Sequence, residues 1–271
     1  MIILIPVNPG RKRLKAVLFD FDGTISTLRC GWEDVMAPFM EEVLAGSRKS
    51  GEAVKKGVAE YIDASTGIQT IFQMQWLAEQ VRDQGRTPLD PWAYKAEYNS
   101  RLMQTVAERR KAVETGAKNA EEYLVAGSRA FLQALKAQGI PLFVASGTDQ
   151  ADVEREAELL GVADYFAEIA GAPPHEASCS KERVIRRLLD QSGMTGEELA
   201  VAGDGKVEIA IAREAGALAL GVASDEARRR GVNSVKLARL QAAGAHAITG
   251  DFEDLPGLLN WLGLRDGCCK A

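Results

Sequence analysis

AVLFDFDGT, residues 16–24, is the most informative stretch of this sequence. Its leading apolar residues are typical of a strand buried in a sheet, and the run ends at Asp20, just before a turn that contains Gly23. Side chains two positions apart share one face of a strand, so Asp20 and Asp22 would repel each other unless a cation lay between them. The stretch predicts a buried strand that leads into an acidic, cation-dependent site.

From residue 127 onward, short apolar runs alternate with amphipathic helical patterns. Such alternation predicts crossover units, and therefore a parallel sheet with helices on both faces. The predicted fold class is α/β, a Rossmann-like three-layer sandwich with a parallel sheet. The expected strands are 15–20, 140–146, 165–171, 198–204 and 217–222, and the expected helices are 127–139, 149–161, 181–193 and 207–216.

Residues 28–124 show only helical patterns, at 32–46, 50–65, 68–83 and 91–116. The gap between Asp20 and the second strand is several times longer than the ~30 residues of one crossover. We therefore expect a helical cap domain inserted after the first strand. The predicted division is an N-terminal extension (1–13, an edge strand or a tail), an α/β core (14–27 and 125–262), a helical cap (28–124) and a C-terminal tail (263–271).

Composition argues against several classes of function. The chain of 271 residues has a net charge of −5, and its basic clusters are short and scattered, so we expect no nucleic-acid partner. It has no apolar run of the ~18 residues that a membrane helix needs, so we expect no membrane partner. Four cysteines, two of them at Cys268 and Cys269, indicate a reducing compartment, and the cytoplasm is the expected location. The only histidines, His175 and His246, have no ligand spacing, which favours a hard metal ion bound by oxygen atoms.

Polar residues follow three of the expected strands. Asp20 and Asp22 follow the first strand, Ser146-Gly147-Thr148 the second, and Asp204 the fourth, while Lys181 begins the helix before that fourth strand. Ligands of open parallel sheets bind at the carboxyl ends of the strands. We therefore expect three carboxylates, a hydroxyl group, a glycine amide and a lysine in one crevice.

This set of groups has a chemical logic. Three carboxylates can share a crevice when a divalent cation such as Mg²⁺ lies among them. Lys181 and the cation would neutralise a phosphoryl group, to which Ser146 and backbone amides would donate hydrogen bonds. Attack of one carboxylate on phosphorus gives an aspartyl-phosphate, and the carboxylate two residues away can protonate the leaving alcohol and later deprotonate water.

The motifs DFDGT, VASGT, Lys181 and GDGKVE occur in this order along the chain, which resembles the haloacid dehalogenase (HAD) superfamily. The resemblance is to its phosphatases with a helical cap after the first strand, of the phosphoglycolate phosphatase and β-phosphoglucomutase-like type. It implies that Asp20 is the nucleophile and that Asp22 is the general acid and base. It further implies catalysis by Asp20, Asp22 and Lys181, phosphate binding by Thr24, Ser146, Gly147 and Lys181, and metal binding by Asp20, Asp22, Asp204 and Glu208.

The sequence departs from this family pattern in two places. ISTLRCGW follows DFDGT where many relatives have a hydrophobic residue and an Asp-Ser pair, and Lys181 lies in SCSKER where Lys-Pro is frequent. Lys206 is the competing candidate for the role of Lys181. In the cap, the polar turn ASTGIQT (64–70) and the residue Arg29 are the candidates for substrate contact, with Thr66 and Gln69 as the side chains in the turn.

The expected function is Mg²⁺-dependent hydrolysis of a small phosphorylated metabolite, either a sugar phosphate or a phosphoglycolate-like acid. A phosphomutase would use the same two aspartates, so it stays open as an alternative. A C–P bond hydrolase is less favoured, since the resemblance implies a small residue where Asp22 stands. A non-catalytic binding module is also less favoured, since it would be expected to have lost Asp20 or Asp22, and both are present.

Overall fold

The structure, a computed structural model, describes residues 1–5, 10–46, 50–177 and 180–264. Its centre is a seven-stranded sheet with the order β1-β7-β6-β5-β2-β3-β4. All neighbouring strands are parallel except β1 and β7. The strands are β1 (Ile2–Ile3), β2 (Ala16–Phe19), β3 (Leu142–Asp149), β4 (Glu168–Ala172), β5 (Leu199–Gly203), β6 (Leu218–Val222) and β7 (Ala247–Thr249).

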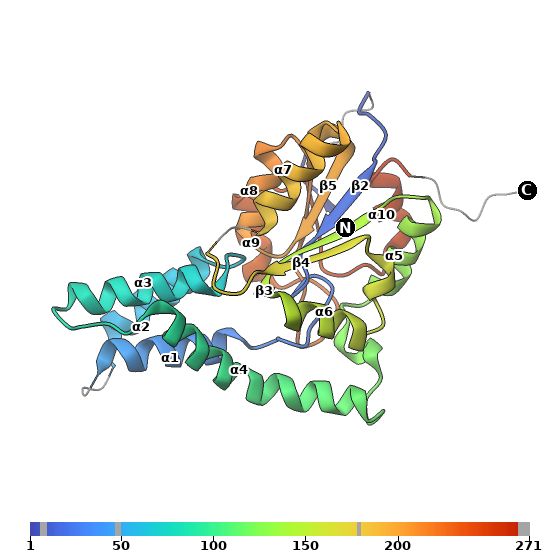
Figure 1. Cartoon of the computed structure of the whole chain (residues 1–271). Coiled ribbons are helices and arrows are strands. Elements are labelled where there is room, and N and C mark those ends of the chain that lie inside the picture. The colour runs from blue at the N-terminus through green and yellow to red at the C-terminus, as the bar shows by residue number, and fades with distance from the viewer. Residues whose placement is uncertain (6–9, 47–49, 178–179, 265–271) are drawn as a thin grey trace, which may run out of the picture.

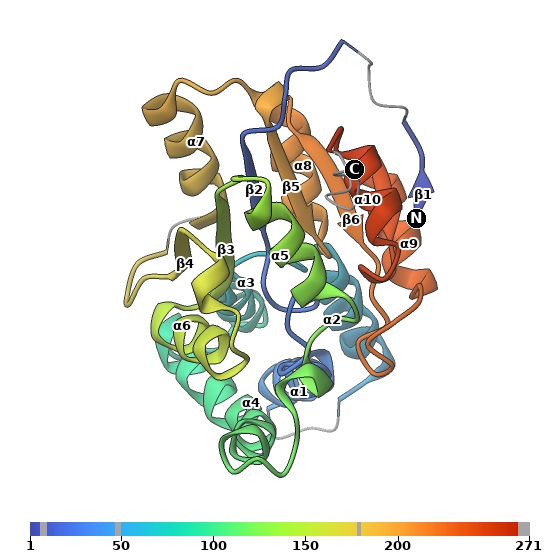
Figure 2. The same ribbon diagram turned by 90° about the vertical axis from the view of Figure 1, so that its right-hand side faces the viewer.

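Helices cover both faces of the sheet (Figures 1 and 2). One face carries α5 (Ser128–Ala137), α6 (Gln150–Leu159) and α10 (Leu255–Trp261), and the other carries α7 (Ser180–Ser192), α8 (Lys206–Glu214) and α9 (Ser234–Ala242). Successive side chains of β2 alternate between the two layers, so Val17 and Phe19 pack with α5 while Ala16 and Leu18 pack with α7 and α8. Burial on both sides explains why this strand is apolar throughout.

The first four helices after β2 form a separate layer beside one end of the sheet (Figure 1). They are α1 (Glu33–Ala45), α2 (Glu52–Ala64), α3 (Thr70–Asp83) and α4 (Pro91–Glu114), and we call them the cap. The cap has its own apolar core, which includes Phe39, Met74 and Leu77. Asp90 caps α4 by accepting a hydrogen bond from Trp92 N–H (2.8 Å), and Pro91 occupies the first turn, as is favourable at a helix start.

The two connections between the cap and the sheet run side by side. Thr27 N–H donates to the carbonyl of Tyr123 (2.8 Å), and Val125 N–H donates to the carbonyl of Ile25 (3.0 Å). We propose this backbone pairing as the boundary between the cap and the α/β core, close to the residue numbers 28 and 124 expected from the sequence. Short 3₁₀ helices are formed by Ala120–Tyr123, Ala163–Tyr165 and Gly196–Glu198.

The five longer strands and the helices α1–α8 correspond to elements predicted from the sequence, whereas β7, α9 and α10 were not predicted. Strand β7 has only three residues, too few to show a period. The N-terminal run provides a short edge strand at Ile2–Ile3, antiparallel to β7. None of the helices in the described part of the chain combines the length and apolar character that a membrane crossing requires. Cys268 and Cys269 lie outside the described residues.

Candidate active site

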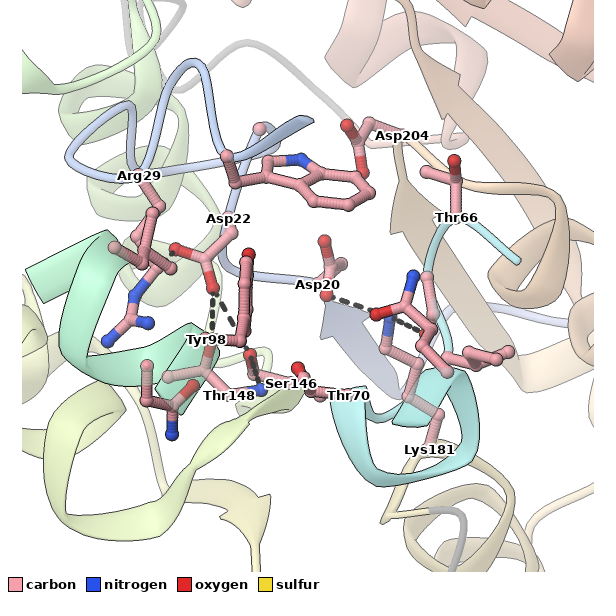
Figure 3. Close-up of a pocket in the computed structure, with 18 of the residues that line it drawn as sticks. Asp20, Asp22, Arg29, Thr66, Thr70, Tyr98, Ser146, Thr148, Lys181 and Asp204 are labelled. Carbon is pink, nitrogen blue, oxygen red and sulfur yellow. Dashed lines mark hydrogen bonds and ion pairs between the residues drawn. The ribbon is translucent and has the colours of Figure 1, made fainter. Parts of the chain in front are cut away.

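A cavity of about 100 Å³ lies where the carboxyl ends of the central strands face the cap (Figure 3). The core contributes acidic, hydroxyl and lysine side chains to its wall, and the cap contributes aromatic and neutral polar ones. The core residues are Asp20, Asp22, Gly23, Ser146, Gly147, Thr148, Lys181, Asp204 and Glu226; Arg29 and Trp32 lie between core and cap, and Thr66, Gly67, Ile68, Thr70, Gln73, Tyr98, Asn99 and Leu102 come from the cap.

Asp20 directly follows the central strand β2, and its backbone N–H continues the ladder by donating to the carbonyl of Ala202 in β5 (2.9 Å). The side chain is buried, and its Oδ1 lies 3.0 Å from Lys181 Nζ. Burial raises the pKa of Asp20 to about 6, against the lowering effect of Lys181, and the charges of Asp204 and Asp22 raise it further. The sheet therefore holds a buried carboxylate beside one cation.

Asp22 lies across the cavity from Lys181 and has different neighbours (Figure 3). Its Oδ2 accepts hydrogen bonds from Thr148 Oγ1 (2.8 Å) and, at 3.5 Å, from Ser146 Oγ, while its Oδ1 lies 3.9 Å from Arg29 Nε. Burial raises the pKa of Asp22 to about 6; Arg29 opposes this shift, and Glu156 adds to it. A carboxyl group with a pKa in this range can both give and accept a proton near neutral pH.

Lys181 is the second residue of α7 and lies at the centre of a group of oxygen atoms. Its Nζ contacts Asp20, the carbonyl of Gly67 (3.0 Å) and, at a short distance, Glu208 Oε1. Glu208 is thus engaged by a lysine inside the core and does not line the cavity. Lys206, the competing lysine, instead contacts Asp63 of α2 at 2.8 Å.

Asp204 follows β5 and is held by a lysine that the sequence analysis did not single out. Lys236 Nζ, from α9, lies 2.6 Å from Asp204 Oδ2 and 2.6 Å from Glu226 Oε1. Ser224 Oγ is also within 3.4 Å of this ammonium group. A signal was available, because Ser224 and Glu226 are polar residues just after the end of β6, the position that drew attention to Asp204 after β5.

The carboxylates of the cavity fit a hard divalent cation by their chemistry. Asp20, Asp22 and Asp204 line the same space, and charge repulsion among them contributes to the raised pKa values of Asp20 and Asp22. Gly23 lets the Asp204 carboxylate approach the turn, because a Cβ at Gly23 (φ +72°) would lie 2.3 Å from Asp204 Oδ2. Within the described ranges, no group of three His, Cys, Asp or Glu side chains has the arrangement needed to hold a metal ion as it stands.

A family model described as haloacid dehalogenase-like hydrolase matches residues 14–216. The chain belongs to the haloacid dehalogenase-like hydrolases. A phosphoglycolate phosphatase from Rhodospirillum rubrum is 29% identical to this hydrolase over 251 residues, which cover 92% of this chain and 91% of the relative.

Solved structures with a similar fold include two further proteins. One is a haloacid dehalogenase-like family hydrolase from Streptococcus pneumoniae (TM-score 0.57, 17% identity, 91% of this chain and 98% of that chain). The other is a β-phosphoglucomutase from Clostridium difficile (TM-score 0.58, 14% identity, 92% and 97%). The predicted family, the class of hydrolase and the Rossmann-like α/β fold are confirmed.

The structure brings most of the predicted site residues of this haloacid dehalogenase-like hydrolase to one cavity. Those that line it are Asp20, Asp22, Arg29, Thr66, Ser146, Gly147, Lys181 and Asp204. Thr24 and Gln69 are buried in the described structure without lining the cavity, and Gln69 is instead the residue preceding α3. The functional roles of all these residues stay predictions.

Arg29 lines the cavity and is also bound by an acidic residue of α6 in the core. Its guanidinium group contacts Glu156 of α6 at 2.8 and 3.2 Å, and Glu156 is fully buried. Asp152, one turn earlier on the same helix, lies 3.4 Å from Arg29 Nη2. This pairing was not predictable from the local sequence, because α6 is distant from Arg29 in the chain.

Proposed function

We propose that this protein is a Mg²⁺-dependent phosphatase that hydrolyses a small phosphate monoester through an aspartyl-phosphate at Asp20. One observation carries the proposal: two carboxyl groups with raised pKa values, the buried Asp20 and the half-buried Asp22, line one cavity together with Ser146, Thr148 and Lys181. The likeness to the Rhodospirillum rubrum phosphoglycolate phosphatase supports phosphate-ester chemistry.

In the first step, an Asp20 carboxylate oxygen attacks phosphorus and the bond from phosphorus to the alcohol oxygen breaks. Asp22 donates its proton to that oxygen, so that the product leaves as a neutral alcohol. In the second step, water attacks the phosphorus of the aspartyl-phosphate and gives a proton to Asp22. Inorganic phosphate leaves, and the Asp20 carboxylate is restored.

The surrounding groups orient the phosphoryl group. Lys181 supplies a positive charge beside Asp20, and Ser146 and Gly147 line the cavity, where the Ser146 hydroxyl and the Gly147 N–H would donate to the oxygen atoms of the phosphoryl group. Asp20, Asp22 and Asp204 would hold Mg²⁺, which would offset the negative charge of the phosphoryl group.

The test is phosphate release from acetyl phosphate and a panel of phosphorylated metabolites. We expect Mg²⁺-dependent turnover that stops with a chelator, and an Asp20→Asn variant that is folded by circular dichroism but at least about a thousandfold slower in kcat. Retention of a tenth of the kcat by Asp20→Asn would overturn the covalent mechanism. Full activity in excess chelator would overturn the role of the metal, and turnover that depends on a sugar bisphosphate would indicate a mutase instead.

A further inference from the structure

The wall of the candidate active site is predominantly acidic. Four carboxylates line it, from Asp20, Asp22, Asp204 and Glu226, against the two cations of Arg29 and Lys181. Burial raises the pKa of Glu226, and the nearby charge of Asp204 raises it further. A divalent cation would offset this excess, but the phosphoryl group of a substrate brings about two negative charges of its own.

Both cations of this wall already face carboxylates of the protein. Arg29 lies against the fully buried Glu156 and 3.9 Å from Asp22. Lys181 lies between Asp20 and Glu208. A carboxylate on the substrate would therefore compete with buried carboxylates for either cation, and loss of a partner by a buried charge is costly.

The nearby Lys236 is engaged in the same way. Its ammonium group spans Asp204 and Glu226 at 2.6 Å from each, and its side chain is 11% exposed. In the part of the chain that the structure describes, the side chains lining the cavity provide no further lysine or arginine beyond Arg29 and Lys181.

The remaining wall is suited to hydroxyl groups. Glu226 offers carboxylate oxygens as acceptors, and Thr66, Thr70 and Asn99 offer neutral polar side chains from the cap. The aromatic ring of Trp32 adds an apolar surface of the kind against which the carbon face of a polyol packs. A site built from hydrogen-bonding groups discriminates strongly against ligands that leave those groups unpaired.

We infer that this site selects phosphate esters of small, neutral polyhydroxyl compounds over esters that carry a second anionic group such as a carboxylate. The inference rests on the proposed phosphatase function and names its substrate class. The cavity of about 100 Å³ restricts the class to small members. The preference separates this chain from the activity for which its Rhodospirillum rubrum relative is named.

The test compares substrates that differ only by CH₂OH in place of a carboxylate. The pairs are 2-hydroxyethyl phosphate with 2-phosphoglycolate, and glycerol 3-phosphate with 3-phosphoglycerate, each measured as kcat/KM with Mg²⁺ at pH 7.5. We expect the neutral ester of each pair to be favoured about tenfold, because like charges across a binding site disfavour the wrong ligand. A ratio of one or below in both pairs would overturn the inference.

Glu226→Gln tests whether Glu226 makes the site prefer neutral phosphate esters over anionic ones. The ratio of neutral to anionic ester should fall several-fold in this variant, because a like charge is removed from the wall. Glu253→Gln is the matched control, since Glu253 is exposed and pairs only loosely with Arg230 at 3.7 Å; its ratio should equal that of the wild type. An unchanged ratio in Glu226→Gln would remove Glu226 from the selection.

Hydrolysis of acetyl phosphate distinguishes failure of the substrate preference from failure of the proposed phosphatase function. A protein that cleaves acetyl phosphate but prefers the anionic esters keeps the proposed function and contradicts the substrate class. A protein that releases phosphate from none of these compounds contradicts the proposed function itself.

Discussion

At the scale of single residues, Asp20 and Asp22 are chemically identical and differ only in what surrounds them. Asp20 faces the ammonium group of Lys181, which suits a carboxylate that must attack. Asp22 accepts a hydrogen bond from Thr148 and lies near Arg29, on the opposite side of the cavity. In the proposed mechanism, the strand and turn that carry both residues would place Asp20 at the reacting phosphorus and Asp22 at the leaving group.

Replacement of Asp22 by alanine should reveal this division of roles. We expect kcat to fall by about 10²–10⁴-fold for alkyl phosphates, whose leaving alcohol needs a proton, and far less for aryl phosphates. The measurement is the ratio of kcat values for glycerol 3-phosphate and p-nitrophenyl phosphate in the two proteins. Equal losses of kcat on both substrates would mean that Asp22 does not donate a proton to the leaving group and serves only to position other groups.

The sequence could predict the residues that follow strand ends, because local patterns reveal both the strand and the polar residue after it. Asp20, Ser146 and Asp204 were found in this way. Glu226 follows a strand too, but no motif marked it. Glu156 and Lys236 act through contacts between distant segments, and no local pattern contains such contacts.

At the scale of elements, the turn between α2 and α3 brings the cap into contact with Lys181. Gly67 has φ +95°, its carbonyl accepts a hydrogen bond from Lys181 Nζ (3.0 Å), and a Cβ there would lie 2.8 Å from Glu208 Oε1. Only glycine combines this backbone conformation with such a close approach. The geometry of the turn and the position of Lys181 are therefore coupled.

Gly67→Ala should damage both stability and catalysis. We expect a loss of about 1–3 kcal/mol in the free energy of unfolding, from left-handed strain and the contact with Glu208, together with a lower kcat. Gly57→Ala is the matched control, because Gly57 lies inside α2 and a Cβ added there would have no atom within 4 Å. The free energy of unfolding of this control should rise by about 0.5–1 kcal/mol, and its kcat should be unchanged. Similar unfolding free energies for the two variants would contradict this account of the turn.

Long, periodic elements were predictable, and short ones were not. The helical patterns between residues 32 and 116 correspond to α1–α4, because each helix has an apolar stripe long enough to show its period. Strand β7 is only three residues long and depends on pairing with β6 and β1. Its formation is decided by tertiary contacts, which composition does not contain.

At the scale of the whole molecule, polar contacts join the cap and the core on both sides of the cavity. Asp63 of α2 lies 2.8 Å from Lys206 and 2.9 Å from Arg239, on α8 and α9. On the other side, Asn99 of α4 donates to Asp149 at the end of β3 (3.0 Å). Charged and amide contacts of this kind can be exchanged for water, which would suit the proposed function if the cap opens to admit substrate and closes to exclude water.

The stability of the whole fold should depend on pH through His246, which precedes β7. Burial, together with Arg213 and Arg11, lowers the pKa of His246 to about 4, and its neutral Nδ1 accepts a hydrogen bond from Ala219 N–H (3.0 Å). Between pH 6.5 and 4 the unfolded chain binds a proton that the folded protein does not, so this residue lowers stability as pH falls. At pH 7.5 the residue is neutral in both states, and the effect vanishes.

Comparison with His246→Gln isolates this contribution, because glutamine keeps an acceptor for the amide and does not titrate. We expect the difference in Tm between wild type and variant to be constant above pH 7 and to shift against the wild type as pH falls from 6.5 to 4.5. Parallel profiles over that range would contradict the role of His246. Asp20 and Asp22 titrate equally in both proteins and cancel in the difference.

The paired connections at residues 25–27 and 123–125 bear on how the sequence between them can vary in evolution. The chain leaves the sheet layer and returns to it at the same point, with backbone hydrogen bonds across the gap. A shorter, longer or differently folded insertion between these two segments would therefore leave the order of the strands unchanged. The strand order, and with it the placement of Asp20, Asp22 and Asp204 after their strands, can therefore stay constant while the inserted helices change.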